Sequence, residues 1–172
     1  ILLIEATKQM QLKNRTITTP LAEFIWKELQ DEVVVVPVLR AGLAMLIAFQ
    51  EMLLKASVGF IGLERDEKTA IAREYYKKIP KILSTHIVYV VAPMLATGGS
   101  MDDTITAVKQ KGAKRIVGVS IVSAPEGIKR VSEHHPDVPI ITSAIDEKLN
   151  ETAYIVPGLG DFGDRYFGTE QL

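Results

Sequence analysis

The chain has no cysteine among its 172 residues, so disulfide bonds and thiolate metal sites are excluded. It also lacks a large excess of one charge, because 20 Lys and Arg residues face 21 Asp and Glu residues and the formal net charge is −1. A dedicated DNA- or RNA-binding surface needs a basic excess. The composition therefore argues against a nucleic-acid partner.

Long apolar runs are missing as well. The longest, Leu43 to Phe49, is far too short to cross a bilayer, which argues against a membrane protein. No signal segment opens the chain and no targeting motif closes it, so we expect a cytoplasmic protein. The chain begins at Ile1, and Ile1 to Ala6 already reads as part of a structured element, so we expect an N-terminal part to be missing.

Apolar, β-branched runs recur along the chain and suit strands that are buried on both faces of a parallel sheet. They are Glu32–Val38, Val58–Leu63, Ile87–Val91, Ile116–Val122 and Val138–Ile145. Helical patterns lie between them, at Leu43–Lys55, Ser100–Lys111 and Pro125–His134. This alternation predicts an α/β fold with a mainly parallel, twisted sheet flanked by helices. No linker interrupts residues 1–172, so a single domain is expected.

Several segments depart from the alternation. Arg15–Pro20 and Glu64–Lys78 are polar, and we expect them to form hairpins or a hood outside the main sheet. Leu21–Leu29 fits helical spacing, although the residues before it favour a strand. Tyr154–Gly168 is rich in Gly and Asp, which predicts a loop with little regular structure. The helix at Leu43–Lys55 is expected to be mostly buried.

The strongest chemical signal lies where a buried strand ends at Ala92 and a helix begins at Ser100. Open α/β sheets bind ligands at the carboxyl ends of their strands. The turn from Thr97 to Ser100 can point backbone N–H groups and two hydroxyls at one phosphate, and the helix dipole favours an anion. Alone, such a turn is common turn chemistry. Its place between strand and helix favours a phosphate cradle, the name used below for Thr97–Ser100.

The segment Pro93-Met-Leu-Ala-Thr-Gly-Gly-Ser100 resembles the phosphoribosyl pyrophosphate motif of type I phosphoribosyltransferases, in the wording of the uracil phosphoribosyltransferase family. Further segments resemble this family in the same order, essentially from Glu5 to Gly168. They are Val36–Leu43, Gly62–Glu67, Ala124–Gly127, Ala144–Asn150 and Tyr154–Arg165. The resemblance implies a type I phosphoribosyltransferase fold.

It also implies a site for phosphoribosyl pyrophosphate. Arg40 would bind the diphosphate in a bidentate manner, and Arg65 would contact it from a lid. Asp161 is assigned to the ribose phosphate substrate, and these three residues are the expected catalytic residues. Arg40, Arg65 and Asp161 are joined in this predicted site by Ala92, Pro93, Met94, Leu95, Ala96, Thr97, Gly98, Gly99 and Ser100.

The resemblance places uracil against backbone groups near the C-terminal end. Uracil's edge alternates C=O and N–H, a pattern that irregular backbone can match while rejecting cytosine. The implied uracil-binding residues are Ile155, Gly160, Asp161 and Phe162. The reaction joins uracil to phosphoribosyl pyrophosphate, giving UMP and diphosphate. Mg²⁺ would arrive on the diphosphate, without a dedicated protein metal site.

Two further partners follow from the same comparison. GTP activates some relatives, so a GTP effector belongs to the expectation. The apolar segments Ile1–Ala6 and Phe24–Trp26, together with the family resemblance, predict a homodimer or a higher homo-oligomer.

One position departs from the family's motif, which carries an Asp where this chain has Ala92. That carboxylate would accept hydrogen bonds from the ribose hydroxyls. A catalytically weakened relative that binds nucleotide as a sensor is therefore an alternative. Another is the RNA-binding regulator of pyrimidine operons that shares the fold, although its motif carries paired acids before the loop and no basic face is evident here.

Other polar residues receive structural interpretations. His86, His134 and His135 lack ligand spacing with carboxylates. Asp102 and Asp103 are expected to stabilise the first turn of their helix rather than contact ribose or metal.

Overall fold

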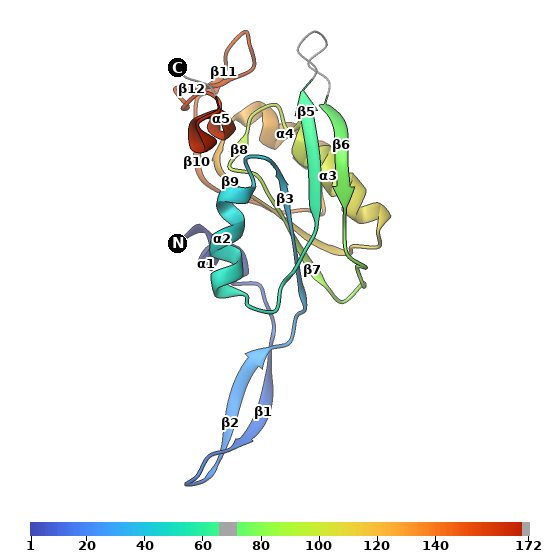
Figure 1. Cartoon of the computed structure of the whole chain (residues 1–172), viewed down its shortest axis with the longest axis vertical. Helices are drawn as coiled ribbons and strands as arrows, with labels where there is room; N and C mark the ends of the chain where they lie inside the picture. The colour runs from blue at the N-terminus through green and yellow to red at the C-terminus, as the bar shows by residue number, and fades with distance from the viewer. Residues whose placement is uncertain (66–71, 170–172) are drawn as a thin grey trace.

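The computed structural model describes residues 1–65 and 72–169 (Figure 1). Its centre is an eight-stranded sheet in the order β10-β9-β7-β3-β5-β6, with β4 (Ser57–Val58) beside β3 and β8 (Met94–Leu95) beside β9. The strands of the main path are β3 (Val33–Leu39), β5 (Phe60–Arg65), β6 (Ala72–Lys78), β7 (Ile87–Val91), β9 (Arg115–Ser123) and β10 (Ile140–Ile145).

Along this path every pairing from β10 to β5 is parallel, and the edge strand β6 runs antiparallel to β5. The central strands carry the longest apolar runs because both of their faces are covered. All of Val33–Val38 and all of Ile87–Val91 are buried. The predicted α/β fold with a mainly parallel sheet is confirmed.

Helices cover both faces of the sheet (Figure 1). On one face, α3 (Gly99–Gln110) and α4 (Pro125–His134) contribute Met101, Ile105 and Val131 to an apolar core with Val34 and Val88. On the other, α1 (Leu2–Thr7) and α2 (Leu43–Met52) pack Leu3 and Phe49 against Val35 and Tyr89. Alternate residues of each strand point to opposite faces, so one run of valines supplies both cores.

The expectation that the helix at Leu43–Lys55 is mostly buried was wrong. The helix ends at Met52, and only one side faces the sheet, through Met45, Leu46 and Phe49. Its outer side is open, with Ile47 56% exposed. An apolar run such as Leu43–Phe49 normally indicates a helix that is buried all round, but here no further layer of the described chain covers the outer side.

An antiparallel hairpin of β1 (Leu12–Thr18) and β2 (Glu23–Leu29), called the N-terminal hairpin below, extends away from the sheet (Figure 1). This confirms the expected hairpin at Arg15–Pro20. The helical spacing of Leu21–Leu29 was misleading, because that segment is the second strand, joined by a turn in which Thr19 N–H donates to Ala22 O at 2.9 Å.

The segment Glu64–Lys78 does not leave the main sheet as expected. Its second half is β6, which pairs with β5 from Phe60 opposite Lys78 to Arg65 opposite Ala72. The parallel pairing between β5 and β3 is short, because it involves only Val38 and Leu39 of β3. The remainder of this expected excursion, residues 66–71, lies outside the described part of the chain.

The C-terminal segment is more regular than expected. It contains β12 (Ile155–Val156), paired with β11 (Lys148–Leu149), and the helix α5 (Phe162–Phe167). Asp161 caps α5, because its Oδ1 accepts a hydrogen bond from Asp164 N–H at 2.9 Å. Glycine and aspartate content therefore predicted the turns and missed the elements between them. None of the helices in residues 1–65 and 72–169 has the length and apolarity needed to span a membrane.

Candidate active site

The parallel strands β3, β7, β9 and β10 all end at one edge of the sheet, at the top of Figure 1. Arg40 follows β3 and Ala92 follows β7, which is the neighbouring strand. The loop after β3 packs against the end of β7, since a β-carbon built on Gly42 would lie 2.7 Å from Val91 O. Arg40 and Ala92, both predicted for the phosphoribosyl pyrophosphate site, therefore lie at the same edge, as expected for ligand-binding positions of an open α/β sheet.

The phosphate cradle lies where β7 passes into α3. Gly98 has φ +82°, a left-handed conformation that favours glycine, and helix α3 begins at Gly99. The first regular helical bond runs from Asp102 N–H to Gly98 O at 2.9 Å, so the preceding amides lie at the helix end, where Gly99 N–H makes a long 3.5 Å bond to Thr97 Oγ1. Thr97 and Ser100 are exposed beside them. The cradle therefore has the arrangement that suits an anion.

Neighbouring backbone fixes the loop that carries the cradle. Pro93 O accepts hydrogen bonds from the N–H groups of Ile121 and Val122, at 2.9 and 3.0 Å. Met94 and Leu95 form β8 against β9. A β-carbon on Gly127 would lie only 2.4 Å from Ala96 O, so α4 packs directly on the loop. Through these contacts the predicted site residues Pro93 to Ala96 fix the position of the cradle.

Arg40 is joined to the C-terminal helix by an ion pair. Its Nη2 donates to Asp164 Oδ1 at 2.7 Å, and its Nη1 lies 3.3 Å from Thr169 Oγ1. Hydrogen bonds from Thr169 and from Arg40 hold the pKa of the Asp164 carboxyl below its ordinary value. Both side chains are partly exposed, so the guanidinium remains accessible to an anion.

A pocket of about 350 Å³ lies between β12 and α5. It brings together Ile155, Gly160 and Asp161, three of the residues predicted to bind uracil, with Asp164, the partner of Arg40. The fourth, Phe162, is not in its lining; its ring stacks on Tyr166 with centroids 5.5 Å apart. The other lining residues are Asn150, Tyr154, Val156, Pro157 and Arg165.

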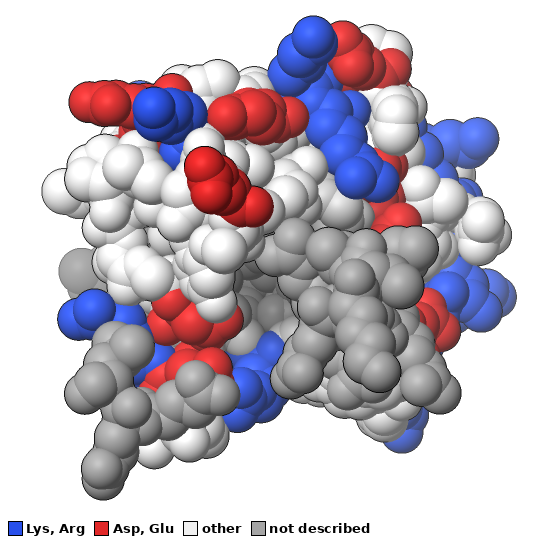
Figure 2. All heavy atoms as spheres, turned by 90° about the horizontal axis from the view of Figure 1, so that it is seen from above, with Lys and Arg blue, Asp and Glu red and all other residues white. Residues whose placement is uncertain are grey.

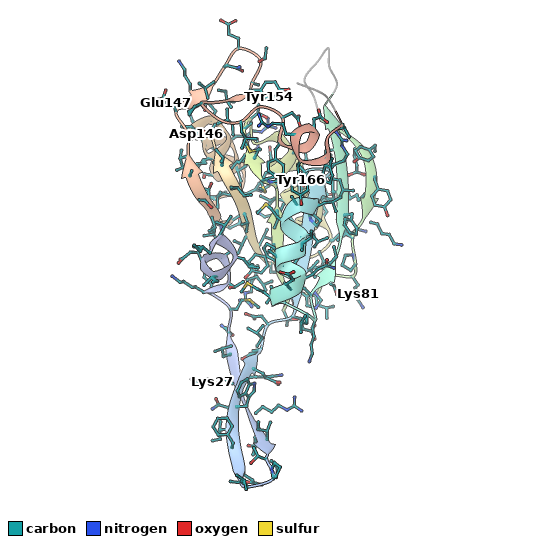
Figure 3. All side chains as sticks on the ribbon, turned by 60° about the vertical axis from the view of Figure 1, so that its left-hand side comes forward. Lys27, Lys81, Asp146, Glu147, Tyr154 and Tyr166 are labelled. Atoms are coloured by element: carbon teal, nitrogen blue, oxygen red, sulfur yellow. The ribbon has the colours of Figure 1, made fainter. Side chains whose placement is uncertain are left out.

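Short polar residues hold the backbone around this pocket, and the sequence interpretation did not single them out. Asp146 Oδ2 accepts from Gly158 N–H at 2.9 Å, and Asn150 Oδ1 accepts from Tyr154 N–H at 2.8 Å. Glu126 Oε1, on α4, accepts from Leu149 N–H at 3.0 Å. Figure 3 shows Asp146 and Tyr154 close together at this end of the molecule. Asp and Asn next to Gly-rich turns were the signal that could have indicated these positions.

The structure describes the side chain of Asp161 but not that of Arg65. Asp161 is exposed and caps α5 through Oδ1. A β-carbon on Gly163 would lie 3.3 Å from that oxygen and 3.9 Å from Ala41 Cβ, so the Asp161 and Arg40 loops adjoin. Arg65 is the last residue of β5, but its side chain lies outside the described part of the structure. Its role as a diphosphate-binding residue stays a prediction.

Asp102 was interpreted as a first-turn helix carboxylate, and the structure gives it a larger role. It is buried, and its carboxylate contacts Arg130 Nε at 3.0 Å, His134 Nδ1 at 2.8 Å and His135 Nε2 at 2.9 Å. These four residues are called the Asp102 cluster below. Arg130 and His134 are four residues apart on α4 and so share a face of the helix. In the sequence, this spacing of two basic side chains was the pattern that could have indicated an acidic partner.

The charges around the edge of the sheet are mixed. Figure 2 looks down on this end and shows acidic and basic side chains interspersed over it. The described residues bring together no group of three or more His, Asp or Glu side chains that could hold a metal ion. An anionic ligand would thus meet individual basic groups and open backbone amides.

The fold, with the cradle and Arg40 at the carboxyl edge of its sheet, matches that of the phosphoribosyltransferase class. The fold is shared with solved structures such as a purine phosphoribosyltransferase from Pyrococcus horikoshii (TM-score 0.54, 22% identity, covering 67% of this chain and 71% of that one). The "AQ2163 protein" of Aquifex aeolicus is more similar, with a TM-score of 0.94 and 36% identity over 99% of this chain and 82% of that one.

Within that class, the chain belongs to the uracil phosphoribosyltransferase family, whose model matches residues 1–169. The uracil phosphoribosyltransferase of Levilactobacillus brevis is 50% identical over 167 residues, which is 96% of this chain and 80% of that protein. That of Campylobacter fetus is 47% identical over 169 residues, 98% of this chain and 81% of that protein. The family expected from the sequence is confirmed.

Proposed function

We propose that this chain catalyses the transfer of the ribose phosphate of phosphoribosyl pyrophosphate to N1 of uracil, giving UMP and diphosphate. Family membership supports the reaction. The observation that carries it to this chain is the pocket between β12 and α5, because Asp164 both lines that pocket and binds Arg40. A base pocket and a diphosphate-binding group thus meet at one place.

Each part of the two substrates is assigned to its own residues in this proposal. The phosphate cradle receives the 5-phosphate, while Arg40 and Arg65 receive the diphosphate. Exposed Asp161 lies between the two substrates. Main-chain groups at Ile155 and Gly160–Phe162 hold the uracil edge, since Ile155 and Gly160 line the pocket.

The reaction is a displacement at the anomeric carbon. The bond to the diphosphate oxygen breaks, positive charge develops on the sugar ring, and uracil N1 forms the new bond from the opposite face while losing its proton. Arg40 stabilises the negative charge on the leaving diphosphate, and the cradle fixes the ribose relative to the base. No covalent intermediate with the protein is needed.

Mg²⁺ is proposed to accompany the diphosphate. Mg²⁺ commonly binds through substrate phosphates with few protein ligands, so the diphosphate itself would supply most of its oxygen ligands. When bound, the metal would neutralise diphosphate charge. Among the protein's own groups, Arg40 is proposed to neutralise diphosphate charge.

The proposal is tested by UMP formation from uracil and phosphoribosyl pyrophosphate, with cytosine as the competing base. We expect uracil to be used and cytosine to be rejected by a factor on the order of 10⁴ or more, because cytosine's amino group would leave buried pocket groups unpaired. Equal use of both bases, or of neither, would refute the assignment.

A catalytically weakened sensor is a second candidate, and Ala92 is the observation that favours it. The residue lies at the end of β7, where a methyl group offers no acceptor for the ribose hydroxyls. Separate measurement of nucleotide affinity and of turnover distinguishes the two, since a sensor binds UMP without forming it.

We expect Gly160→Val to weaken uracil binding more than Ile155→Ala does. A β-carbon on Gly160 meets no atom within 4 Å, so a valine side chain there would take up open space at the pocket proposed for uracil. The φ of +77° at this position also disfavours valine. Ile155 contributes main-chain groups, which truncation leaves in place. The uracil KM of both variants, beside their free energies of unfolding, is the measurement. Wild-type uracil affinity in both would show that the pocket is misplaced.

The protein is proposed to be a homodimer that buries the N-terminal hairpin. Phe24 and Trp26 belong to a segment from which the sequence predicts association, and each is 53% exposed on β2. Their ring centroids are 6.5 Å apart on one face of β2, and Ile25, 62% exposed, adds an apolar side chain to the opposite face. The occupant we infer is a second copy. A GTP effector and a cytoplasmic location are proposed from family resemblance alone.

Light scattering at micromolar concentration should give the mass of a dimer. Trp26→Lys should shift it toward the monomer, because a charge placed in a buried apolar contact is costly. Leu83→Lys makes the same change at another exposed apolar residue and should leave the mass unchanged. A wild-type monomer would contradict the proposal.

A further inference from the structure

The Asp102 cluster places a cation beside the phosphate cradle. Asp102 is the fourth residue of α3 and only 6% exposed, yet its carboxylate faces α4 and contacts Arg130. Burial alone would raise the pKa of the Asp102 carboxyl, but hydrogen bonds from Arg130, His134 and His135 outweigh it and lower that pKa. An ionised Asp102 therefore holds Arg130 next to the start of α3.

Arg130 runs across the turn of the cradle. A β-carbon built on Gly98 would lie 3.4 Å from Arg130 Cβ. One built on Gly99 would lie 3.6 Å from Arg130 Nη1 and 3.7 Å from Thr97 Oγ1. The guanidinium and the threonine hydroxyl thus border the same small space above Gly99, beside the open amides of the helix end.

The guanidinium has donors to spare. Among the described residues its protein hydrogen bond is made by Nε, to Asp102, and its side chain is 44% exposed. The two Nη groups carry the remaining N–H donors of the fork, and this planar arrangement suits phosphate oxygens. A side chain held at Nε is pre-ordered, so less freedom is lost when its Nη groups bind a ligand.

We propose that Arg130 is a further substrate-binding residue, which donates from its Nη groups to the 5-phosphate in the cradle, and that Asp102 is its positioning residue. The inference rests on the proposed function, which supplies a ribose 5-phosphate at this turn. His134 and His135 complete the arrangement by holding Asp102 from its other sides.

The test compares two ligands that differ only in the phosphate, UMP and uridine, by calorimetry on the intact chain. In wild type, UMP should bind more tightly than uridine. Arg130→Met keeps most of the aliphatic stem and removes the charge, so the ratio of UMP to uridine affinity should fall about tenfold. Lys129→Met removes the same charge one residue earlier, from a side chain that is 75% exposed, and should leave the ratio unchanged.

Two further variants separate direct contact from helix packing. Arg130→Lys keeps a charge without the fork and should give a ratio between those of wild type and Arg130→Met. Asp102→Asn should also lower the ratio. In the double variant Asp102→Asn/Arg130→Met the ratio should fall no further than in Arg130→Met, because Asp102 acts through Arg130. Free energies of unfolding are measured for each variant.

A wild-type ratio in Arg130→Met would overturn the inference, as would an equal loss of UMP and uridine affinity, which indicates general damage. An unchanged ratio in Asp102→Asn would overturn the positioning role. If wild type binds UMP no better than uridine, the cradle itself is wrong and the inference falls with it. UMP formation by wild type tests the proposed function separately. The result of that test does not depend on the Arg130 variants.

Discussion

Replacing Arg40 by Gln should lower kcat/KM for phosphoribosyl pyrophosphate by roughly 10²- to 10³-fold, the cost of removing one preorganised donor to developing negative charge. The guanidinium lies at the end of β3 and is oriented by Asp164 at 2.7 Å before substrate arrives. The diphosphate gains charge as it leaves, so the loss should appear in kcat as well as in KM.

Two variants frame this result. Arg40→Lys retains the charge without the bidentate fork and should fall between wild type and Arg40→Gln. Lys81→Gln removes a positive charge from the loop before β7, away from the pocket residues in Figure 3, and should leave the kinetics unchanged. Because the Arg40 side chain is half exposed, its ion pair contributes little to folding. Arg40→Gln with wild-type kcat/KM would remove Arg40 from the site.

The core of the fold was readable from sequence because the signals were local and strong. The buried run at Val33–Val38 contains apolar residues only and became β3. At Pro125–His134 the proline at the first position suits a helix start, and α4 has these bounds. The cradle was found for the same reason, since Gly98 and Gly99 lie between a buried strand and a helix.

The features that sequence reasoning missed depend on distant partners. β6 is polar and tyrosine-rich, and only its pairing with β5 makes it an edge strand. Alternation on the N-terminal hairpin is obscured because both of its faces are exposed within the chain. Asp102 looked like an ordinary first-turn acid, since the side chains that surround it lie 28 to 33 residues further along.

The same limit applies to the candidate site. Arg40 and Asp164 are 124 residues apart, so their pairing could not be derived from spacing. The residues predicted to bind uracil came from resemblance to the family, and the structure adds a pocket that three of the four line. Phe162 shows the difference, because it belongs to the resembled motif but its ring packs on Tyr166 rather than lining the pocket.

Restoring a carboxylate with Ala92→Asp should tighten the affinity for phosphoribosyl pyrophosphate about tenfold to hundredfold and raise UMP formation. Ala92 directly follows β7, its N–H donates to Val119 O at 3.1 Å, and it is 8% exposed. A carboxylate at this strand end would accept hydrogen bonds from the ribose diol. A hydrogen bond to a charged acceptor contributes on the order of 1.5–3 kcal/mol, which converts to that range of affinity.

The unliganded variant should be less stable than wild type, because a buried carboxylate without its ribose partner is poorly solvated. Substrate should restore that stability, since a ligand that binds only the folded state stabilises it. Ala92→Asn, with the same shape and no charge, should give a smaller gain. Affinity and UMP formation that both rise with Ala92→Asp indicate an enzyme attenuated at this position. No change would mean that another group already holds the ribose. Asp103 is then the candidate, because it is exposed near the start of α3 whereas Asp102 is committed to Arg130, His134 and His135.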